Sequence, residues 1–152
     1  MSPNQKHANT NNPIQGILLG FDFGMKRIGV AVGQTVTQSA RALATVAAKA
    51  GEPDWQTITQ LVKKWQPCAF VVGIPLNMDG TEQPITHHAR EFCQKLSVRF
   101  KLTVFEMDER LTTKDAKEKL FSAGGFKALQ DGQVDAMAAQ LILQNWLDAE
   151  NR

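Results

Sequence analysis

Short apolar runs alternate along the chain with stretches in which apolar residues recur at helical spacing. Apolar runs rich in β-branched residues predict buried strands, and they lie at residues 17–23, 28–32, 41–46, 69–72 and 102–107. A four-residue segment that begins with Gly24 separates the first two runs, so we expect a hairpin, with 41–46 as a third antiparallel strand. The run at 69–72 is apolar throughout, which is typical of a parallel strand buried on both faces.

Helical spacing predicts four helices, at about residues 55–65, 85–96, 112–123 and 134–150. Asp54 is a candidate N-cap for the first helix, and Pro84 suits the first turn of the second. Thr112 and Asp115 resemble a capping pair for the third. The resulting order, β-β-β-α-β-α-β-α-α, predicts an α/β fold in which an antiparallel hairpin leads into a parallel segment flanked by helices.

The N-terminal residues 1–15 differ from the rest of the chain, being rich in Asn, Pro and Thr with few large apolar side chains. They cannot bury enough apolar surface to offset the entropy of ordering, so we expect a disordered tail. Residues 16–150 are then expected to form a single domain. That suits a chain of 152 residues with 43% hydrophobic and 21% charged residues.

Several classes of protein are excluded by composition. No apolar run approaches the roughly 18 residues of a membrane span, and no apolar signal core follows the N-terminus, so we expect no membrane partner. Cys68 and Cys93 form neither a disulfide framework nor a zinc site, which favours the reducing cytoplasm. A net charge of +2 is too small to identify a nucleic-acid partner by bulk electrostatics.

Asp22 interrupts the first apolar strand. Burying a carboxylate without hydrogen bonds, a cation or a metal would be costly, so this position indicates a functional site. The alternative is a solvated or ion-paired strand residue, with Lys26 or Arg27 as its partner.

Carboxylates also stand at the edges of two other apolar elements. The sequence Asp108-Glu109-Arg110 follows the strand at 102–107, and open α/β sheets place ligands at the carboxyl ends of parallel strands. Asp135 begins the last helix, where the helix N-terminus favours an anion. Taken singly, the first would be an ordinary loop charge cluster and the second a helix cap.

An open α/β sheet can bring these three chain segments to one place, and clustered like charges then need a cation between them. All the candidate ligands are oxygen donors, with no Cys or His at metal-like spacing, so Mg²⁺ or Mn²⁺ is expected rather than zinc. Two such ions about 3.5–4 Å apart would activate a water and stabilise the leaving oxygen of a phosphodiester.

Four segments, in order, resemble the YqgF-type proteins, also called RuvX: FDFGMKRIGVAVG at 21–33, VVGIPLNMDGTEQP at 71–84, DERLTT at 108–113 and VDAMAAQLIL at 134–143. Members of that family are described as Holliday junction resolvases and as nucleases that process pre-16S ribosomal RNA. The resemblance implies a ribonuclease H-like α/β fold. Its mixed five-stranded sheet would have three antiparallel strands first and helices on both faces.

The resemblance also implies an acidic site, in which Asp22, Glu109 and Asp135 are the catalytic and metal-binding carboxylates. Asp22 would bridge two metals, with the other two residues on either side. The family's DER motif makes Glu109 the second carboxylate, although Asp108 belongs to the same motif. Neighbouring strand residues point to opposite faces, so only one of the pair is expected to reach a metal shared with Asp22.

Basic residues near these motifs are candidates for contacts with substrate phosphates or with the carboxylates themselves, since arginine offers bidentate geometry to either. They are Lys26, Arg27, Arg41 and Arg110. Asn77, Asp79 and Thr81 would lie in a substrate-facing loop without an assigned chemical role.

The leading hypothesis is therefore a metal-dependent endonuclease that processes the 5′ end of pre-16S ribosomal RNA, with ribosomal or transcription proteins as further partners. The alternative nuclease is a Holliday junction resolvase acting on branched DNA in recombination. Resolving a symmetric junction needs two coordinated sites, hence a dimer. The sequence has no obvious dimer helix, so we expect a monomer or a weak homodimer.

Two hypotheses from other classes compete with these. A non-cleaving nucleic-acid-binding factor in transcription or ribosome assembly is disfavoured by the retention of all three carboxylates. A phosphotransferase resembling actin and sugar kinases needs two such domains around a cleft, about twice the length of this chain.

Overall fold

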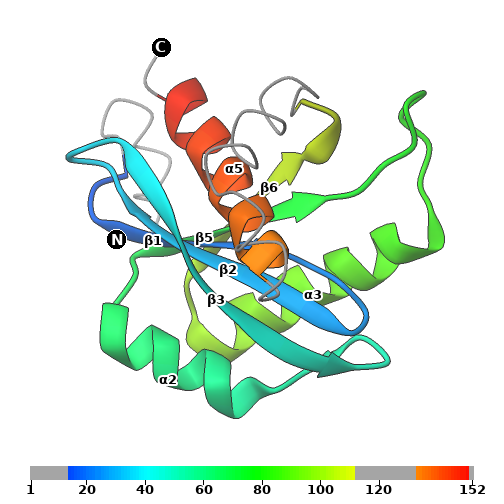
Figure 1. Cartoon of the computed structure of the whole chain (residues 1–152), viewed down its shortest axis with the longest axis horizontal. Coiled ribbons are helices and arrows are strands. Elements are labelled where there is room, and N and C mark those ends of the chain that lie inside the picture. The colour runs from blue at the N-terminus through cyan, green and yellow to red at the C-terminus, as the bar shows by residue number, and fades with distance from the viewer. Residues whose placement is uncertain (1–13, 112–132, 151–152) are drawn as a thin grey trace.

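The computed structural model describes residues 14–111 and 133–150 (Figure 1). Its sheet is built from β1 (Ile17–Asp22), β2 (Arg27–Gln34), β3 (Ser39–Lys49), β4 (Glu52–Pro53), β5 (Ala69–Ile74) and β6 (Thr103–Asp108). The strands lie in the order β4-β3-β2-β1-β5-β6. β1 to β4 pair antiparallel, whereas β5 pairs parallel with both β1 and β6. The mixed sheet and its antiparallel first strands are confirmed.

The sixth strand, β4, was not expected. Ala50 and Gly51 both have positive φ, at 51° and 86°, which turns the chain sharply back after β3. Glu52 and Pro53 then pair with Lys49 and Ala48. Two residues are too few to show a periodic signal in a sequence, so the segment was expected only to interrupt the chain.

Three helices complete the described fold: α2 (Trp55–Trp65), α3 (Pro84–Phe100) and α5 (Gln133–Glu150). Asp54 caps α2 as expected, because its carboxylate accepts from the Thr57 amide at 3.4 Å and from the Thr57 hydroxyl at 2.8 Å. Pro84 begins α3, also as expected. The helix expected at 112–123 and most of the expected N-terminal tail, residues 1–13, lie outside the described residues.

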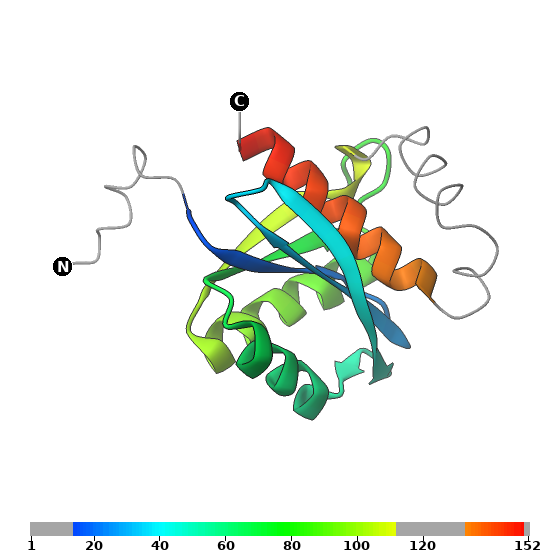
Figure 2. The ribbon, with the colours of Figure 1, turned by 60° about the vertical axis from the view of Figure 1, so that its left-hand side comes forward.

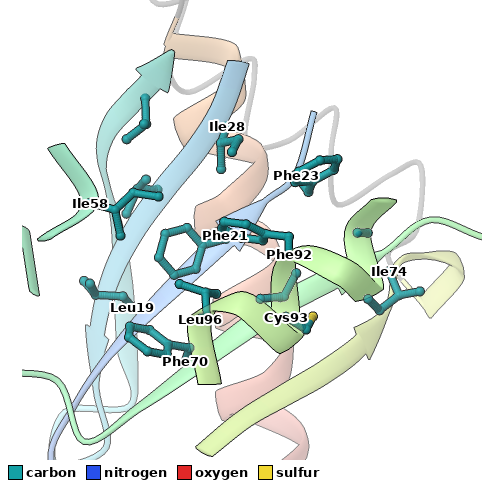
Figure 3. Packing of buried hydrophobic residues seen from close by; sticks show 14 of the residues in the cluster. Leu19, Phe21, Phe23, Ile28, Ile58, Phe70, Ile74, Phe92, Cys93 and Leu96 are labelled. Atoms are coloured by element: carbon teal, nitrogen blue, oxygen red, sulfur yellow. The ribbon is translucent and has the colours of Figure 1, made fainter. Parts of the chain in front are cut away.

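Helices cover both faces of the sheet (Figure 2), which confirms that expectation. On one face, α2 and α3 enclose a core in which Phe21 and Phe70 of the sheet meet Phe92 of α3 (Figure 3). The ring centroids of Phe21 and Phe92 lie 5.3 Å apart in an edge-to-face arrangement. On the other face, α5 packs Leu143 and Trp146 against the sheet.

Small residues allow α5 to lie close to the sheet. The positions of β1 and β2 that face this helix include Gly20, Gly29 and Gly33, and a Cβ at any of them would come within 3.0 Å of an atom of α5. Gly20 would meet Leu143, whereas Gly29 would meet the backbone of Asp135. The glycines therefore fix where the N-terminal turn of α5 sits, and this position matters for the site described below.

Helices long and apolar enough to cross a membrane do not occur in the described part of the chain. Cys68 and Cys93 are both free, as expected from the sequence, and burial raises the pKa of the Cys93 thiol to about 12.

Candidate active site

Asp22 is the last residue of β1, and both of its neighbours across the sheet are glycines. Its partner on β2 is Gly29, and its partner on β5 is Gly73. Because side chains alternate along a strand, Asp22 lies on the same face as Leu18, which packs beneath α5. Asp22 is partly buried, and the two glycines leave room at this level of the sheet for groups from other elements.

Glu109 and Ile142 of α5 fill the space above one of these glycines. Glu109 begins η2 (Glu109–Leu111), a 3-10 turn that follows β6 directly. A Cβ at Gly73 would lie 2.5 Å from Cδ1 of Ile142, 2.9 Å from Oε2 of Glu109 and 3.0 Å from its Cγ. Since Gly73 pairs with Asp22, the Glu109 carboxylate lies beside Asp22 on the α5 face of the sheet.

Asp135 lies over the other glycine, in the first turn of α5. A Cβ at Gly29 would be only 1.8 Å from the Asp135 carbonyl oxygen and 2.9 Å from the Ala136 nitrogen. The Asp135 side chain, 28% exposed, accepts from Nε of Arg27 at 3.0 Å. Three segments far apart in the sequence thus meet around Asp22.

The three acidic residues do not form a ready-made metal site. Within residues 14–111 and 133–150, no three His, Cys, Asp or Glu side chains are grouped so that they could hold a metal ion as they stand. The Asp135 carboxylate is turned toward Arg27. The donor set nevertheless consists of carboxylate oxygens alone, which are the ligands that Mg²⁺ and Mn²⁺ prefer.

Asp108 belongs to a different part of the structure. It pairs with Ile74, which packs in the α2–α3 core, so Asp108 points away from the face that holds Asp22. Its carboxylate accepts hydrogen bonds from the Arg110 guanidinium, in which Nη2 lies 2.6 Å from Oδ2 and Nε lies 3.1 Å from both oxygens. The side-chain hydrogen bond from Arg110 lowers the pKa of Asp108 and raises that of Arg110.

Replacing Asp108 by Asn is expected to destabilise the fold in a pH-dependent way. Because the pKa of Asp108 is lower in the folded state than in the unfolded chain, ionised Asp108 stabilises the fold above the ordinary aspartate pKa of about 3.9. This contribution is lost as the pH falls through the folded-state pKa. Urea unfolding of the wild type and Asp108→Asn should therefore show a gap in unfolding free energy at pH 7 that closes below about pH 4. A gap that stays constant on acidification would contradict the ion pair.

The four basic candidates are placed in different parts of the structure. Arg27 lies at the site through its bond to Asp135, and the exposed Lys26 precedes it in the β1–β2 hairpin. Arg110 is held by Asp108 and donates to the Met78 carbonyl at 3.1 Å. Arg41 is not brought to the carboxylates. Arg41 pairs with Val32 of β2, which in turn pairs with Leu19 of β1, three residues before Asp22. Its side chain lies on the α2 face, where its guanidinium is 5.2 Å from the centre of the Trp65 ring.

The ion pair of Arg27 with Asp135 is expected to add little stability. Arg27 is 64% exposed, and exposed pairs contribute about 1 kcal/mol or less. Arg27→Gln should therefore lower the free energy of unfolding in urea by no more than about 1 kcal/mol. Lys26→Gln in the same hairpin is the matched control. A loss several times larger would mean that Arg27 holds the start of α5 on the sheet.

The sequence analysis missed the two glycines that flank Asp22. Gly29 interrupts the apolar run of β2 and Gly73 that of β5, and a glycine inside a strand can mark a close approach by another backbone or side chain. The sequence therefore contained a signal for each glycine. It did not contain the strand register, which shows that both glycines are partners of Asp22.

Comparison with known proteins identifies the family. The family described as RuvX: Holliday junction resolvase matches residues 16–149. The chain belongs to the RuvX family. Two bacterial relatives carry the name "Putative pre-16S rRNA nuclease". The chain is 54% identical over 131 residues to the relative from Shewanella oneidensis, and the aligned region covers 86% of this chain and 93% of that protein. It is 53% identical over 134 residues to the one from Pectobacterium atrosepticum, covering 88% and 96%.

Two solved Holliday junction resolvases have a fold similar to that of this RuvX chain. RuvC from T. thermophilus in complex with Holliday junction substrate gives a TM-score of 0.55 at 15% identity, covering 90% of this chain and 96% of RuvC. Fowlpox virus resolvase with Holliday junction DNA gives 0.57 at 9% identity, covering 90% and 99%. At such low identity these structures bear on the fold alone, and they confirm the ribonuclease H-like architecture.

Proposed function

We propose that this RuvX-family protein is an endonuclease that hydrolyses phosphodiester bonds in structured nucleic acid and processes the 5′ end of pre-16S ribosomal RNA. One observation carries the proposal: Asp22 lies between Gly29 and Gly73, where the backbone of Asp135 approaches one glycine and Glu109, together with Ile142, approaches the other. A glycine inside a strand can mark such a close approach by another element. Here the approach brings the acidic residues of three separate segments to one level of the sheet.

The three carboxylates fit a hard divalent cation, Mg²⁺ or Mn²⁺, and the protein would bind two such ions. Asp22, Glu109 and Asp135 would hold these ions through their carboxylate oxygens. When bound, the cations would lower the pKa of a water and neutralise charge on the phosphodiester. Because clustered carboxylates repel one another, substrate and cation are expected to bind together more tightly than either alone.

Arg27 and the start of α5 prepare the site for an anionic substrate. The Arg27 side chain donates one N–H to Asp135, and the exposed guanidinium carries four further N–H groups that could donate to a phosphate. The N-terminal turn of α5 also favours negative charge. Both features would hold a phosphodiester on the α5 face, next to Asp22, where the reaction would occur.

We favour a ribosomal RNA precursor over a four-way DNA junction as the substrate. The relatives at 53–54% identity carry the pre-16S ribosomal RNA name over nearly the whole chain. The junction resolvases, at 9–15% identity, share only the fold. A precursor RNA would also place the reaction in the cytoplasm, and cleavage of one strand needs no second active site.

Cleavage by the purified full-length protein tests this proposal. The two substrates, a pre-16S ribosomal RNA fragment and a four-way DNA junction, are offered with Mg²⁺, with Mn²⁺ and with a chelator. We expect metal-dependent cutting of the RNA and little cutting of the junction. Preferred cutting of the junction would support a resolvase instead. Binding of the RNA without any cutting would favour the non-cleaving factor and overturn the proposal.

A further inference from the structure

Met78 is exposed in a way that the fold does not explain. Its surface is 86% accessible, and Val36 and Val98 are the other large apolar residues left exposed in the described part of the chain. Met78 lies in the loop between β5 and α3, only five residues after Gly73, the partner of Asp22. An exposed thioether near a candidate active site raises the question of what it contacts.

The loop that carries Met78 is tightly ordered by its own hydrogen bonds. The Asp79 carboxylate accepts from the Thr81 amide at 3.0 Å and from the Thr81 hydroxyl at 2.6 Å. Asn77 donates its side-chain amide to the same hydroxyl at 2.9 Å, and Leu76 forms an isolated bridge with Glu82. The turn thus resembles a small hairpin that presents Met78 at its tip. Because the loop is already ordered, a contact made by Met78 costs little further entropy.

Arg110 binds this loop to η2, the turn after β6 that also contains Glu109. Its guanidinium is oriented by Asp108 and donates to the Met78 carbonyl at 3.1 Å. It also lies over Gly80, whose φ of 91° suits glycine, and a Cβ there would be 3.3 Å from Nη1 of Arg110. The residue next to Glu109 in the sequence therefore fixes the backbone of Met78 relative to the site.

We propose that Met78 is a substrate-positioning residue, and that its side chain packs against the face of an unpaired or unstacked nucleobase close to the scissile phosphodiester. The inference rests on the proposed function and adds the part of the substrate that the loop contacts. A thioether is soft and polarizable, and it makes favourable contacts with the edges and faces of aromatic rings. Apolar side chains of this kind are also inserted between bases by other nucleic-acid-binding proteins.

Charge favours a base over a phosphate as the group that Met78 contacts. The segment from Pro75 to Gln83 contains two acidic residues, Asp79 and Glu82, and no lysine or arginine. The guanidinium of Arg110, which contacts the loop from η2, is already paired with Asp108. A phosphate would therefore gain little at the tip, whereas a base presents an uncharged aromatic face.

Fluorescence of 2-aminopurine measures this contact directly. The probe is a pre-16S ribosomal RNA hairpin that carries 2-aminopurine in an unpaired stretch, titrated with full-length protein in EDTA so that no metal-dependent cutting occurs. Met78→Ala is expected to weaken binding about fivefold, at the low end of the range for base stacking contacts, and to abolish most of the fluorescence change. Met78→Leu should restore both, and Val98→Ala, which truncates an exposed apolar residue of α3, should behave as wild type.

Equal behaviour of Met78→Ala and Val98→Ala would overturn the proposal, as would a wild type whose binding leaves 2-aminopurine unchanged. The cleavage assay is read separately. If the fluorescence change depends on Met78 but no cutting occurs in Mg²⁺ or Mn²⁺, the proposed function is contradicted and the base contact is supported. If Met78→Ala and Val98→Ala cut the RNA with the same KM and kcat, the proposed function would stand and the base contact would be overturned.

Arg110→Gln tests whether Arg110 acts through this loop. If it only positions Met78, the variant should weaken binding by a similar factor, Met78→Ala should add nothing to it, and the slope of log affinity against log salt should stay that of the wild type. A slope reduced by about one would assign Arg110 to a phosphate contact and overturn its role as the loop anchor.

Discussion

Asp22→Asn is expected to lower the rate of metal-dependent RNA cleavage by about a thousandfold or more. A bound cation contributes several kcal/mol of transition-state stabilisation, and each 1.36 kcal/mol corresponds to a factor of ten in rate. Asp22 lies between the other two acidic residues, so its loss should affect every ion held there. Glu109→Gln and Asp135→Asn should also lose most activity. Single-turnover cleavage in Mg²⁺ and Mn²⁺ provides the measurement.

Asp108→Asn is the matched control for this series. Asp108 is adjacent to Glu109 in the sequence and carries the same charge, but it points to the opposite face and is held by Arg110. Its replacement should leave the requirement for metal unchanged and cost far less rate than Glu109→Gln. A variant of Asp108 as inactive as that of Glu109 would mean that the second metal ligand has been assigned to the wrong residue. Activity that survives Asp22→Asn would point to a contaminating nuclease or to a different site.

The strands and helices follow closely from the pattern of apolar residues. The strand expected at 102–107 is observed at Thr103–Asp108, and the helix expected at 134–150 is observed at Gln133–Glu150. These elements are buried on a face, so their periodicity is strong. β3 extends to Lys49, beyond the expected end at residue 46, because it continues along the edge of the sheet where its side chains are alternately exposed and no apolar run marks it.

The divergence of Asp108 and Glu109 could be expected from the sequence, but not which of the two faces Asp22. Alternation along a strand needs only the strand and its period, which a sequence supplies. The structure puts Glu109 over Gly73 and Asp108 on the other face. That assignment of faces needs the register of the neighbouring strands.

The partners of the arginines required the three-dimensional structure. Arg27, Arg41 and Arg110 all stand in polar stretches near motifs, and nothing in their local sequence distinguishes them. Register puts Arg41 at the level of Leu19 on the α2 face, whereas it puts Arg27 beneath the start of α5. Arg110 turns back to Asp108 because its own backbone amide is already bound to that carboxylate at 2.9 Å. Such partners depend on contacts between residues distant in the sequence or on rotamers.

Gly29→Ala is expected to destabilise the protein by about 3 kcal/mol, the upper part of the range for overpacked positions. The added Cβ would sit 1.8 Å from the Asp135 carbonyl oxygen, which is backbone and cannot rotate away. In an open strand the same change would favour folding by about 0.5–1 kcal/mol, since alanine loses less conformational entropy than glycine. The steric contact and the entropy gain have opposite effects on stability, and the energy cost of the contact is expected to exceed the gain. Urea unfolding measures the difference in free energy.

The same substitution should also impair cleavage in the molecules that remain folded. To relieve the contact, the first turn of α5 must move away from β2, and Asp135 moves with it away from Asp22. Gly33→Ala is the matched control, because it adds the same methyl group to the same face of β2. There the Cβ would meet the backbone carbonyl oxygen of Ser39 at 2.9 Å, a much longer approach than the 1.8 Å at Gly29, and the flexible end of Leu143 at 3.0 Å. Both contacts are far from the carboxylates. It should cost less stability and leave the cleavage rate of the folded protein near that of wild type. If Gly29→Ala folded and cut as well as Gly33→Ala, α5 could not be held in place by its contact with Gly29, and the argument that this glycine shapes the site would fail.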